Sequence, residues 1–222
     1  MVACDASTEP TGPTPVEALL AQDSAFRALA GDSSNLHIGF DYADLNRERW
    51  QKPALVLDLF GDLRGRTIVE VGSGTGFFTR RLAERGARVL ALDISPEVLV
   101  ELDSLNAAAL DSATYARIDA SLVPADDPAL EPEEADGALM VNTFMYIRDG
   151  AEYLRRLRRG LAGGSAVVIV DFMGAETPVG PPVDTRMPLE EVTEALRAAG
   201  YRDVEVEEGL LEYQYVVRAV VP

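Results

Sequence analysis

The hydrophobic positions of the chain change period twice between residues 67 and 93, and this change predicts two strands with a helix between them. Thr67–Val71 is a short β-branched run that predicts a buried strand, whereas Phe77–Arg85 places its apolar residues at helical spacing. Gly86 stands where a helix is expected to stop, and Val89–Leu92 is a second apolar run. The stretch therefore predicts strand, glycine turn, helix and strand, which is half of a nucleotide-binding α/β unit.

Strand-like and helix-like runs continue to alternate toward the C-terminus, which predicts one α/β domain. The last two runs alternate polar and apolar residues and are expected to pair as an antiparallel hairpin at the sheet edge. We therefore predict a single Rossmann-like, seven-stranded, mostly parallel sheet with helices on both faces and an antiparallel C-terminal hairpin strand. Further strands are expected at residues 115–118, 137–141, 166–172, 204–207 and 213–221, and further helices at 96–109, 150–161 and 189–199.

The N-terminal part of the chain has a different pattern. Residues 1–15 combine Pro, Thr, Ser and Gly without apolar periodicity, so we expect a disordered leader. Residues 16–60 are expected to form a helical cap, with helices at 16–29 and 53–60. The α/β domain then occupies residues 61–222.

Length and charge narrow the function classes. A chain of 222 residues with 47% hydrophobic residues is enough for one α/β domain with a sizeable core. Its formal net charge of −17 argues against nucleic-acid binding, because phosphate contacts need clustered Lys and Arg. Arg155, Arg156, Arg158 and Arg159 do cluster, but neighbouring acids on the same helix predict a solvated surface. No nucleic-acid partner is therefore expected.

The single cysteine, Cys4, excludes an internal disulfide. The tripeptide Val2-Ala3-Cys4 is similar to the end of a bacterial lipoprotein signal, in which the cysteine becomes lipidated. No positively charged region or apolar run precedes it, so the sequence does not support export. We expect a cytoplasmic protein without a transmembrane segment, with a lipid anchor through Cys4 as the alternative.

The glycine spacing after the first strand narrows the choice of nucleotide. Gly72, Gly74 and Gly76 follow as G-x-G-x-G, whereas the dinucleotide fingerprint needs its third glycine at the position of Phe77. A dinucleotide, and with it an NAD-type oxidoreductase, is therefore the less favoured alternative. Glycines in this turn let the backbone approach a ligand with no Cβ in the way.

Two carboxylates flank this turn. Glu70 lies just inside the strand end, where its charge would repel a pyrophosphate but attract a cationic sulfonium. Asp93 ends the next strand, where a carboxylate can accept hydrogen bonds from both hydroxyls of a ribose. Together they predict a site for a positively charged nucleoside.

The run Glu-Val-Gly-Ser-Gly-Thr-Gly at 70–76, followed by Ala-Leu-Asp at 91–93, resembles the class I S-adenosylmethionine (SAM)-dependent methyltransferases, specifically their small-molecule, ubiquinone-type branch. The resemblance covers roughly residues 37–222. It implies a bacterial enzyme whose residues 61–222 bind SAM and transfer its methyl group to a small-molecule acceptor, leaving S-adenosylhomocysteine. It also implies that Asp119, at the end of the third strand, contacts the adenine. The expected cofactor contacts are Glu70, Gly72, Ser73, Gly74, Gly76, Asp93, Ile94, Asp119, Ala120 and Asn142.

The segment from His37 to Trp50 is polar and aromatic with no single period. In the family that the chain resembles, such a segment before Gln-Lys-Pro covers the cofactor and shapes the acceptor pocket. The alternative is that its aromatic residues only pack the segment onto the core. The candidate cap residues are His37, Tyr42, Arg47, Trp50 and Gln51.

The residues after the fourth strand depart from the resembling family. Many small-molecule methyltransferases carry one or two histidines facing the acceptor here, whereas this chain has Met145 and Tyr146, and its single histidine is His37. A histidine base at this strand end is therefore excluded. An acceptor that is already nucleophilic needs no base. For an acceptor that must lose a proton, Tyr146 is the candidate catalytic relay, and a water beside Glu70 is the alternative. Met145 is expected in the acceptor pocket, and no metal site is expected.

The missing histidine keeps a second function class open, namely a SAM-binding sensor or partner module without catalysis. Binding of SAM combined with a turnover assay separates the two classes. The sequence leaves the identity of the acceptor open, because the acceptor pocket is built from cap and loop segments without a motif of fixed chemical meaning. A homodimer stays an open alternative to a monomer.

Overall fold

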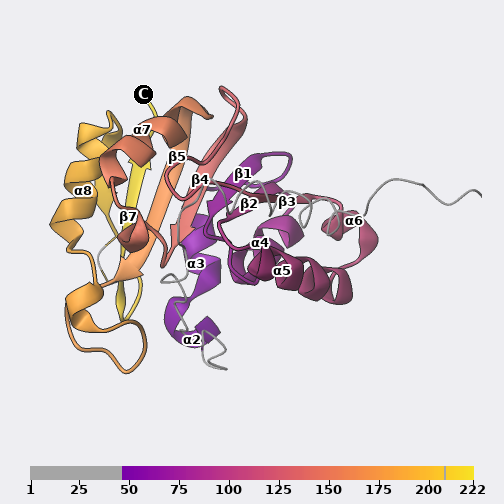
Figure 1. Ribbon diagram of the computed structural model, residues 1–222, viewed down its shortest axis with the longest axis horizontal. Helices are drawn as coiled ribbons and strands as arrows, with labels where there is room; N and C mark the ends of the chain where they lie inside the picture. Colours follow the sequence, from indigo (N-terminus) through magenta and orange to yellow (C-terminus); the bar gives the residue numbers. More distant parts are fainter. Residues whose placement is uncertain (1–46, 208) are drawn as a thin grey trace, which may run out of the picture.

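The computed structural model describes residues 47–207 and 209–222, and its centre is one seven-stranded sheet. The strands are β1 (Thr67–Val71), β2 (Arg88–Asp93), β3 (Ile118–Leu122), β4 (Ala135–Val141), β5 (Leu161–Phe172), β6 (Arg202–Val206) and β7 (Gln214–Val220). They lie in the order β3-β2-β1-β4-β5-β7-β6 (Figure 1). Pairing is parallel from β3 to β5, and β7 is antiparallel to both β5 and β6. This confirms the predicted fold class.

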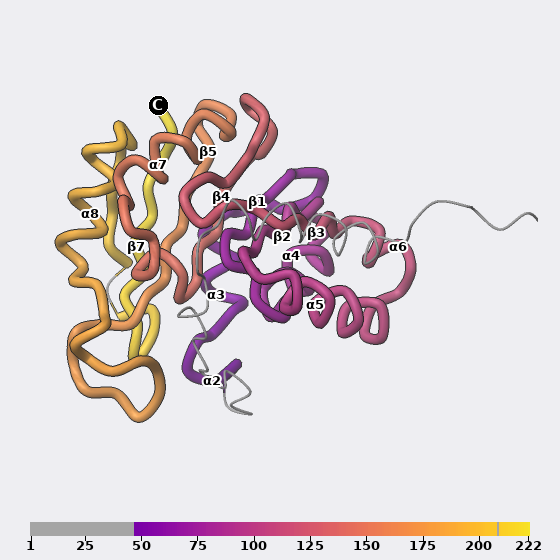
Figure 2. Tube along the Cα trace, viewed as in Figure 1, coloured from indigo at the N-terminus to yellow at the C-terminus, as the bar shows by residue number. Residues whose placement is uncertain are grey.

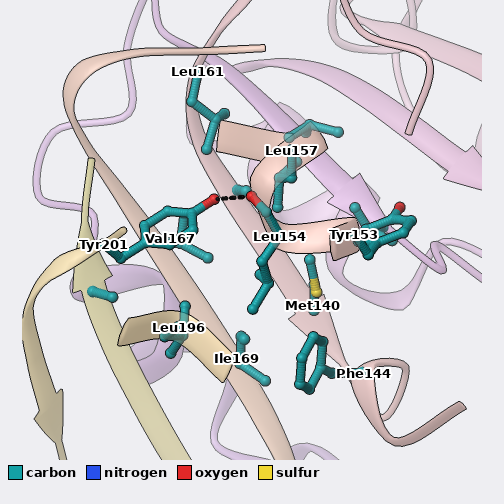
Figure 3. Packing of buried hydrophobic residues seen from close by; sticks show 14 of the residues in the cluster. Met140, Phe144, Tyr153, Leu154, Leu157, Leu161, Val167, Ile169, Leu196 and Tyr201 are labelled. Atoms are coloured by element: carbon teal, nitrogen blue, oxygen red, sulfur yellow. Dashed lines mark hydrogen bonds between the residues drawn. The ribbon is translucent and has the colours of Figure 1, made fainter. Parts of the chain in front are cut away.

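Helices cover both faces of the sheet. They are α2 (Arg47–Gln51), α3 (Pro53–Asp58), α4 (Phe77–Glu84), α5 (Pro96–Ala109), α6 (Ser112–Tyr115), α7 (Gly150–Arg159) and α8 (Leu189–Ala198), with 3-10 helices η2 (Phe144–Tyr146) and η3 (Val183–Thr185). One apolar core joins the sheet to α7 and α8, and the other joins it to α3, α4 and α5. Figure 3 shows the first core, where the Tyr201 hydroxyl donates a hydrogen bond to the Leu154 carbonyl at 3.1 Å.

The strand order reverses between β1 and β4. The chain builds outward from β1 to β2 and β3, and then returns to place β4 on the other side of β1. Figure 2 shows this division, with the indigo-to-magenta segments on one side and the orange-to-yellow segments on the other. Open α/β sheets bind ligands outside the carboxyl ends of their strands at such a reversal, so this edge is where a site is expected.

The third strand differs from its prediction. Ser112–Tyr115 forms α6, whose start is capped by the Asp111 carboxylate through two backbone N–H bonds of 2.9 and 3.0 Å. This extra helical turn delays β3 until Ile118, so the predicted strand at 115–118 is wrong. Asp119 is consequently the second residue of β3 and does not lie at its carboxyl end.

The other element boundaries agree more closely with their predictions. The fifth strand starts at Leu161 instead of residue 166, because the preceding helix ends at Arg159. The predicted leader and the helix at 16–29 lie outside the described residues, and the boundaries between leader, cap and α/β domain stay predictions. Within the described part of the chain, no helix combines the length and the apolar character that crossing a bilayer requires.

Candidate functional site

A cavity of about 810 Å³ opens at the carboxyl ends of β1, β2 and β4, where the strand order reverses. Its wall combines backbone from the glycine turn, carboxylates from two strands and apolar side chains from α5. Nine of the residues predicted from the sequence line it: Arg47, Glu70, Gly72, Ser73, Gly74, Asp93, Ile94, Asn142 and Tyr146. The structure therefore brings most of the predicted cofactor site together.

The glycine turn is held against β2 by its own backbone. The N–H groups of Gly72 and Ser73 both donate to the Leu92 carbonyl, at 2.8 and 3.0 Å. A Cβ on Gly72 would lie 2.3 Å from the Thr143 Oγ1, and its φ of +71° further restricts the position to glycine. Gly74 has a φ of +54° but no atom within 4 Å of an added Cβ, so its backbone faces open space for a ligand.

The third glycine of the motif has a different role. Gly76 precedes α4 with a φ of 86°, and a Cβ there would lie 3.1 Å from the Asn106 side chain and 3.3 Å from Leu102. It thus allows α4 to approach α5, and it is absent from the cavity wall formed by the described residues. The prediction that Gly76 contacts the cofactor finds no support in this geometry.

Backbone N–H groups from two loops hold the Asp93 carboxylate in place. Its Oδ2 accepts from the Gly74 N–H at 2.9 Å, and its Oδ1 accepts from the N–H groups of Ile94 and Ser95 at 2.8 and 3.1 Å. Burial raises the pKa of Asp93, while these three N–H groups act in the opposite direction. The carboxylate therefore ties the glycine turn to the start of α5 and presents its remaining lone pairs to the cavity.

Glu70 is buried at the floor of the cavity, with 3% of its surface exposed. Its Oε2 accepts a hydrogen bond of 2.6 Å from the Thr79 hydroxyl. Burial raises the pKa of Glu70 to about 8, against the hydrogen bond from Thr79 and the charges of Arg47 and Arg80. Burial disfavours the ionised Glu70 carboxylate. A cation bound beside it would attract the negative charge and so stabilise the ionised form.

A buried chain of amides links α2 to the end of β4. Arg47 Nε donates to Gln51 Oε1 at 2.6 Å, Gln51 Nε2 donates to Gln214 Oε1 at 2.9 Å, and Gln214 Nε2 donates to Asn142 Oδ1. Gln51, Gln214 and Asn142 are all buried. From the sequence, the Gln214-Tyr215 pair in the last strand is best interpreted as structural strand filler, whereas the structure gives Gln214 the central position in this network.

Asp171 is a buried residue that the sequence interpretation missed. It is fully buried in β5, and neither carboxylate oxygen has a hydrogen-bond partner of normal geometry among the described residues. Burial raises its pKa to about 8, and the Met145 N–H has a smaller effect in the opposite direction. An acid that interrupts the apolar run at 166–172 was the signal that could have identified it.

Several predicted site residues lie elsewhere. Asp119 and Ala120 are inside β3, and the Asp119 carboxylate forms an ion pair of 2.7 Å with Arg88 at the surface. The predicted adenine contact of Asp119 and the predicted cofactor contact of Ala120 are therefore not supported, because residues 123–125 line the cavity instead. The delayed start of β3 is the physical reason.

The cap residues divide into two groups. Arg47 lines the cavity, whereas Trp50 packs against the rings of Phe172 and Tyr213 at centroid distances of 5.8 and 6.1 Å, as the packing alternative predicted. Gln51 and Met145 are also absent from the described cavity wall, although Gln51 acts on it through the amide chain. His37 and Tyr42 lie outside the described residues.

Fold and site together define a class: a Rossmann-like α/β domain with a cavity for a nucleoside at the reversal of its strand order. The family model described as "Methyltransferase domain" matches residues 69–169, which include both carboxylates and the glycine turn. These residues are thus similar to a methyltransferase domain, in agreement with the resemblance seen in the sequence.

Curated relatives carry methyltransferase names. The demethylmenaquinone methyltransferase of Tropheryma whipplei is 28% identical over 145 residues, which are 65% of this chain and 55% of that protein. An uncharacterized methyltransferase of Mycobacterium tuberculosis is 29% identical over 136 residues, or 61% of this chain and 52% of that protein. The chain thus spans about half the length of the curated relatives that it matches.

Solved structures share the fold over nearly the whole chain. A SAM-dependent methyltransferase from Aquifex aeolicus superimposes with a TM-score of 0.72 and 24% identity, covering 90% of this chain and 98% of its own. The [4+2]-cyclase SpnF superimposes with a TM-score of 0.67 and 18% identity, covering 95% and 97% of the two chains. Because the same fold carries a protein named for another reaction, the function has to be argued from the site.

Proposed function

We propose that this protein is a SAM-dependent methyltransferase that acts on a small-molecule acceptor. The observation that carries the proposal is the meeting of Glu70, the open backbone of Gly74 and Asp93 around one cavity. An ionised carboxylate at the cavity floor would repel an anionic nucleotide, whereas it would stabilise a sulfonium. The methyltransferase domain match over residues 69–169 supports the same cofactor.

Each part of the cavity suits one part of SAM. Asp93 is placed to accept hydrogen bonds from the ribose hydroxyls, and the backbone at Gly74 leaves room for the chain that carries the sulfonium. Val98 and Leu105 of α5 provide an apolar wall for a purine ring. Leu105 is 41% exposed, so a ring that covers it would remove apolar surface from water.

Bound SAM would supply a methyl group that its positive sulfur already activates for in-line displacement. The protein then has to orient the acceptor and exclude water, which is catalysis by proximity. Arg47 and Asn142 line the cavity and are joined through Gln51 and Gln214, so we assign this amide chain the task of holding the cap over the cofactor. Tyr146, on the same wall, is our candidate for the acceptor side.

Two measurements on the purified chain test this proposal. Calorimetric titration should show binding of SAM and of S-adenosylhomocysteine, and no comparable binding of NAD. Incubation with SAM and a panel of phenols, thiols and amines should yield S-adenosylhomocysteine. Binding of NAD in place of SAM would contradict the proposal and favour an oxidoreductase.

A SAM-binding module without methyl transfer is the second candidate. Two observations favour keeping it: the histidine-free strand end at Met145 and Tyr146, and the shared fold with a protein named as a cyclase. Binding of SAM without turnover on any member of the panel would select this candidate. For the methyltransferase we expect a cytoplasmic location, where SAM is synthesised, and a small-molecule partner.

A further inference from the structure

Two buried polar groups near the cavity lack the hydrogen bonds that such groups normally make. The Tyr146 hydroxyl and both carboxylate oxygens of Asp171 are buried and have no hydrogen-bond partner of normal geometry among the described residues. Buried polar groups of this kind are rare because leaving one unpaired costs about 1–3 kcal/mol. Two such groups in neighbouring segments point to a function that outweighs their cost in stability.

The sheet brings these two residues together. Side chains alternate along β5, and Val167 and Ile169 face the core under α7 and α8, so Asp171 continues on that same face. Phe144 of η2 belongs to the same core, and Figure 3 shows it beside Ile169 and Met140. The turn that carries Tyr146 therefore lies over the end of β5, next to Asp171.

Two further contacts fix this arrangement. The Asn142 N–H donates to the Val170 carbonyl at 2.8 Å, which locks the end of β4 beside the residue that precedes Asp171. The Met145 N–H acts on the Asp171 carboxyl, and the charge of that carboxyl raises the pKa of Tyr146, in addition to the larger effect of burial. Tyr146 itself lines the cavity, and no hydrogen bond joins its hydroxyl to the Asp171 carboxylate, so a proton would pass between them through a bridging water.

We propose that Asp171 is the residue that takes up the acceptor's proton, with the Tyr146 hydroxyl as the relay between them. This inference rests on the proposed methyltransferase function. A tyrosine in the cavity and a carboxylate behind it would together perform the proton transfer for which many relatives use a histidine at this strand end. Tyr146 is then a catalytic residue, and Asp171 is a positioning residue that acts through it.

The proton and electron balance of the step is complete. The acceptor gives its proton to the Tyr146 oxygen, Tyr146 gives its own proton to a bridging water, and that water gives one of its protons to the Asp171 carboxylate. The electron pair left on the acceptor forms the new bond to the methyl carbon, and the carbon–sulfur bond breaks with its pair staying on sulfur. The cation is thereby discharged, the acceptor is methylated, and Asp171 ends as a neutral acid.

Asp171 has a second tyrosine neighbour that provides a matched control. Tyr215 lies opposite Asp171 across the β5–β7 ladder, and burial and the charges of Asp171 and Glu191 raise its pKa. Its hydroxyl already donates to the Met187 carbonyl at 3.1 Å. The groups that face Asp171 are thus Tyr146 from η2, Tyr215 from β7 and the Met145 N–H, and the Tyr215 hydroxyl is otherwise engaged.

The first test observes the carboxyl group without needing turnover. In a chain labelled with carbon-13 at the aspartate carboxyls and saturated with S-adenosylhomocysteine, one resonance absent from Asp171→Asn should titrate near pH 8. Tyr146→Phe should shift this titration more than Tyr215→Phe does. An Asp171 resonance that titrates in the ordinary aspartate range, or that Tyr146→Phe leaves unchanged, would overturn the proposal.

The second test uses two acceptors of matched shape, 4-methylphenol and 4-methylthiophenol, of which the thiol ionises unaided near neutral pH. Asp171→Asn and Tyr146→Phe should lower kcat for the phenol by about 10²–10⁴-fold and remove its rise with pH through about 8, while thiol methylation stays within a few-fold. Tyr215→Phe should leave both rates near the wild-type values.

Equal losses on phenol and thiol would mean a merely structural role for Asp171, and methylation of the thiol alone by the wild type would exclude the relay. If neither probe is methylated, the carboxyl titration decides on the Asp171–Tyr146 pair. Calorimetry with SAM on each variant tests the proposed function separately from the relay. A chain that binds no SAM would refute the methyltransferase function, whatever the carboxyl titration shows.

Discussion

Replacing Asp171 by asparagine should stabilise the protein, and the gain should depend on pH. In the folded chain the buried carboxyl has a pKa of about 8, compared with an ordinary value of 3.8. Between these two values the unfolded chain carries the ionised form and the folded chain carries the neutral one. The wild type therefore loses stability as pH rises from about 4 to about 8, by about 1.4 kcal/mol for each pH unit.

The size of the effect at neutral pH follows from this slope. About three pH units separate pH 7 from the ordinary value of 3.8, so the wild type carries a penalty of about 4 kcal/mol that an amide cannot have. The asparagine amide lacks partners just as the neutral acid does, so that cost cancels to a first approximation. Such a gain is large against a typical folding stability of about 5–15 kcal/mol.

Urea unfolding of the wild type and Asp171→Asn at about pH 4, 5.5 and 7 measures this difference directly. The two proteins should be equally stable near pH 4, and the variant should be more stable at each higher pH. The control is Asp119→Asn, which removes an exposed ion pair with Arg88 and should change stability by less than about 1 kcal/mol. A difference that does not vary with pH, or a variant that is less stable at pH 7, would refute the reasoning.

The remaining predictions concern the cofactor side of the cavity. Gly72→Ala should lower the free energy of unfolding by about 2–5 kcal/mol, because the added Cβ would collide with Thr143. Gly74→Ala should lower it by only about 1–2 kcal/mol, through backbone strain alone. Equal losses for the two variants in thermal unfolding would contradict this difference. Gln214→Ala should lower the free energy of unfolding in urea by about 2–4 kcal/mol, because the buried amides of Gln51 and Asn142 would each lose a hydrogen-bond partner. A change below about 0.5 kcal/mol would argue against the network. Asp93→Asn should weaken SAM binding at least about tenfold in calorimetry, and unchanged affinity would remove its assigned role.

The parts of the fold that the sequence predicted are those set by local pattern. The strand, glycine turn, helix and strand between Thr67 and Asp93 follow from apolar period and glycine placement alone, and their carboxylates meet in one cavity because parallel strands end at the same edge. Asp119 was misplaced for an equally local reason. The Asp111 cap adds a helical turn that the apolar pattern does not reveal, and this shifts the strand by three residues.

Other site residues depend on contacts between distant segments. Gln214 meets Asn142 across a sequence separation of 72 residues and Gln51 across 163, so no local pattern could assign its role. In the sequence, Asp171 is only an acid within an apolar run. Its significance comes from the folded structure, in which its carboxylate is buried without hydrogen-bond partners of normal geometry among the described residues. Trp50 was the converse case, an aromatic residue near the cap that the structure uses for packing.

The most direct test of the central claim is a calorimetric titration with SAM at about pH 6 and pH 9, on the wild type and on Glu70→Gln. S-adenosylhomocysteine, which lacks the positive sulfur but keeps the same amino group, is the matched ligand. The wild type should bind SAM more tightly at the higher pH, where Glu70 is ionised, and Glu70→Gln should abolish the part of this gain that S-adenosylhomocysteine does not share. Failure of SAM to bind, or an affinity gain with pH that is the same for both ligands and both proteins, would contradict a sulfonium site at Glu70.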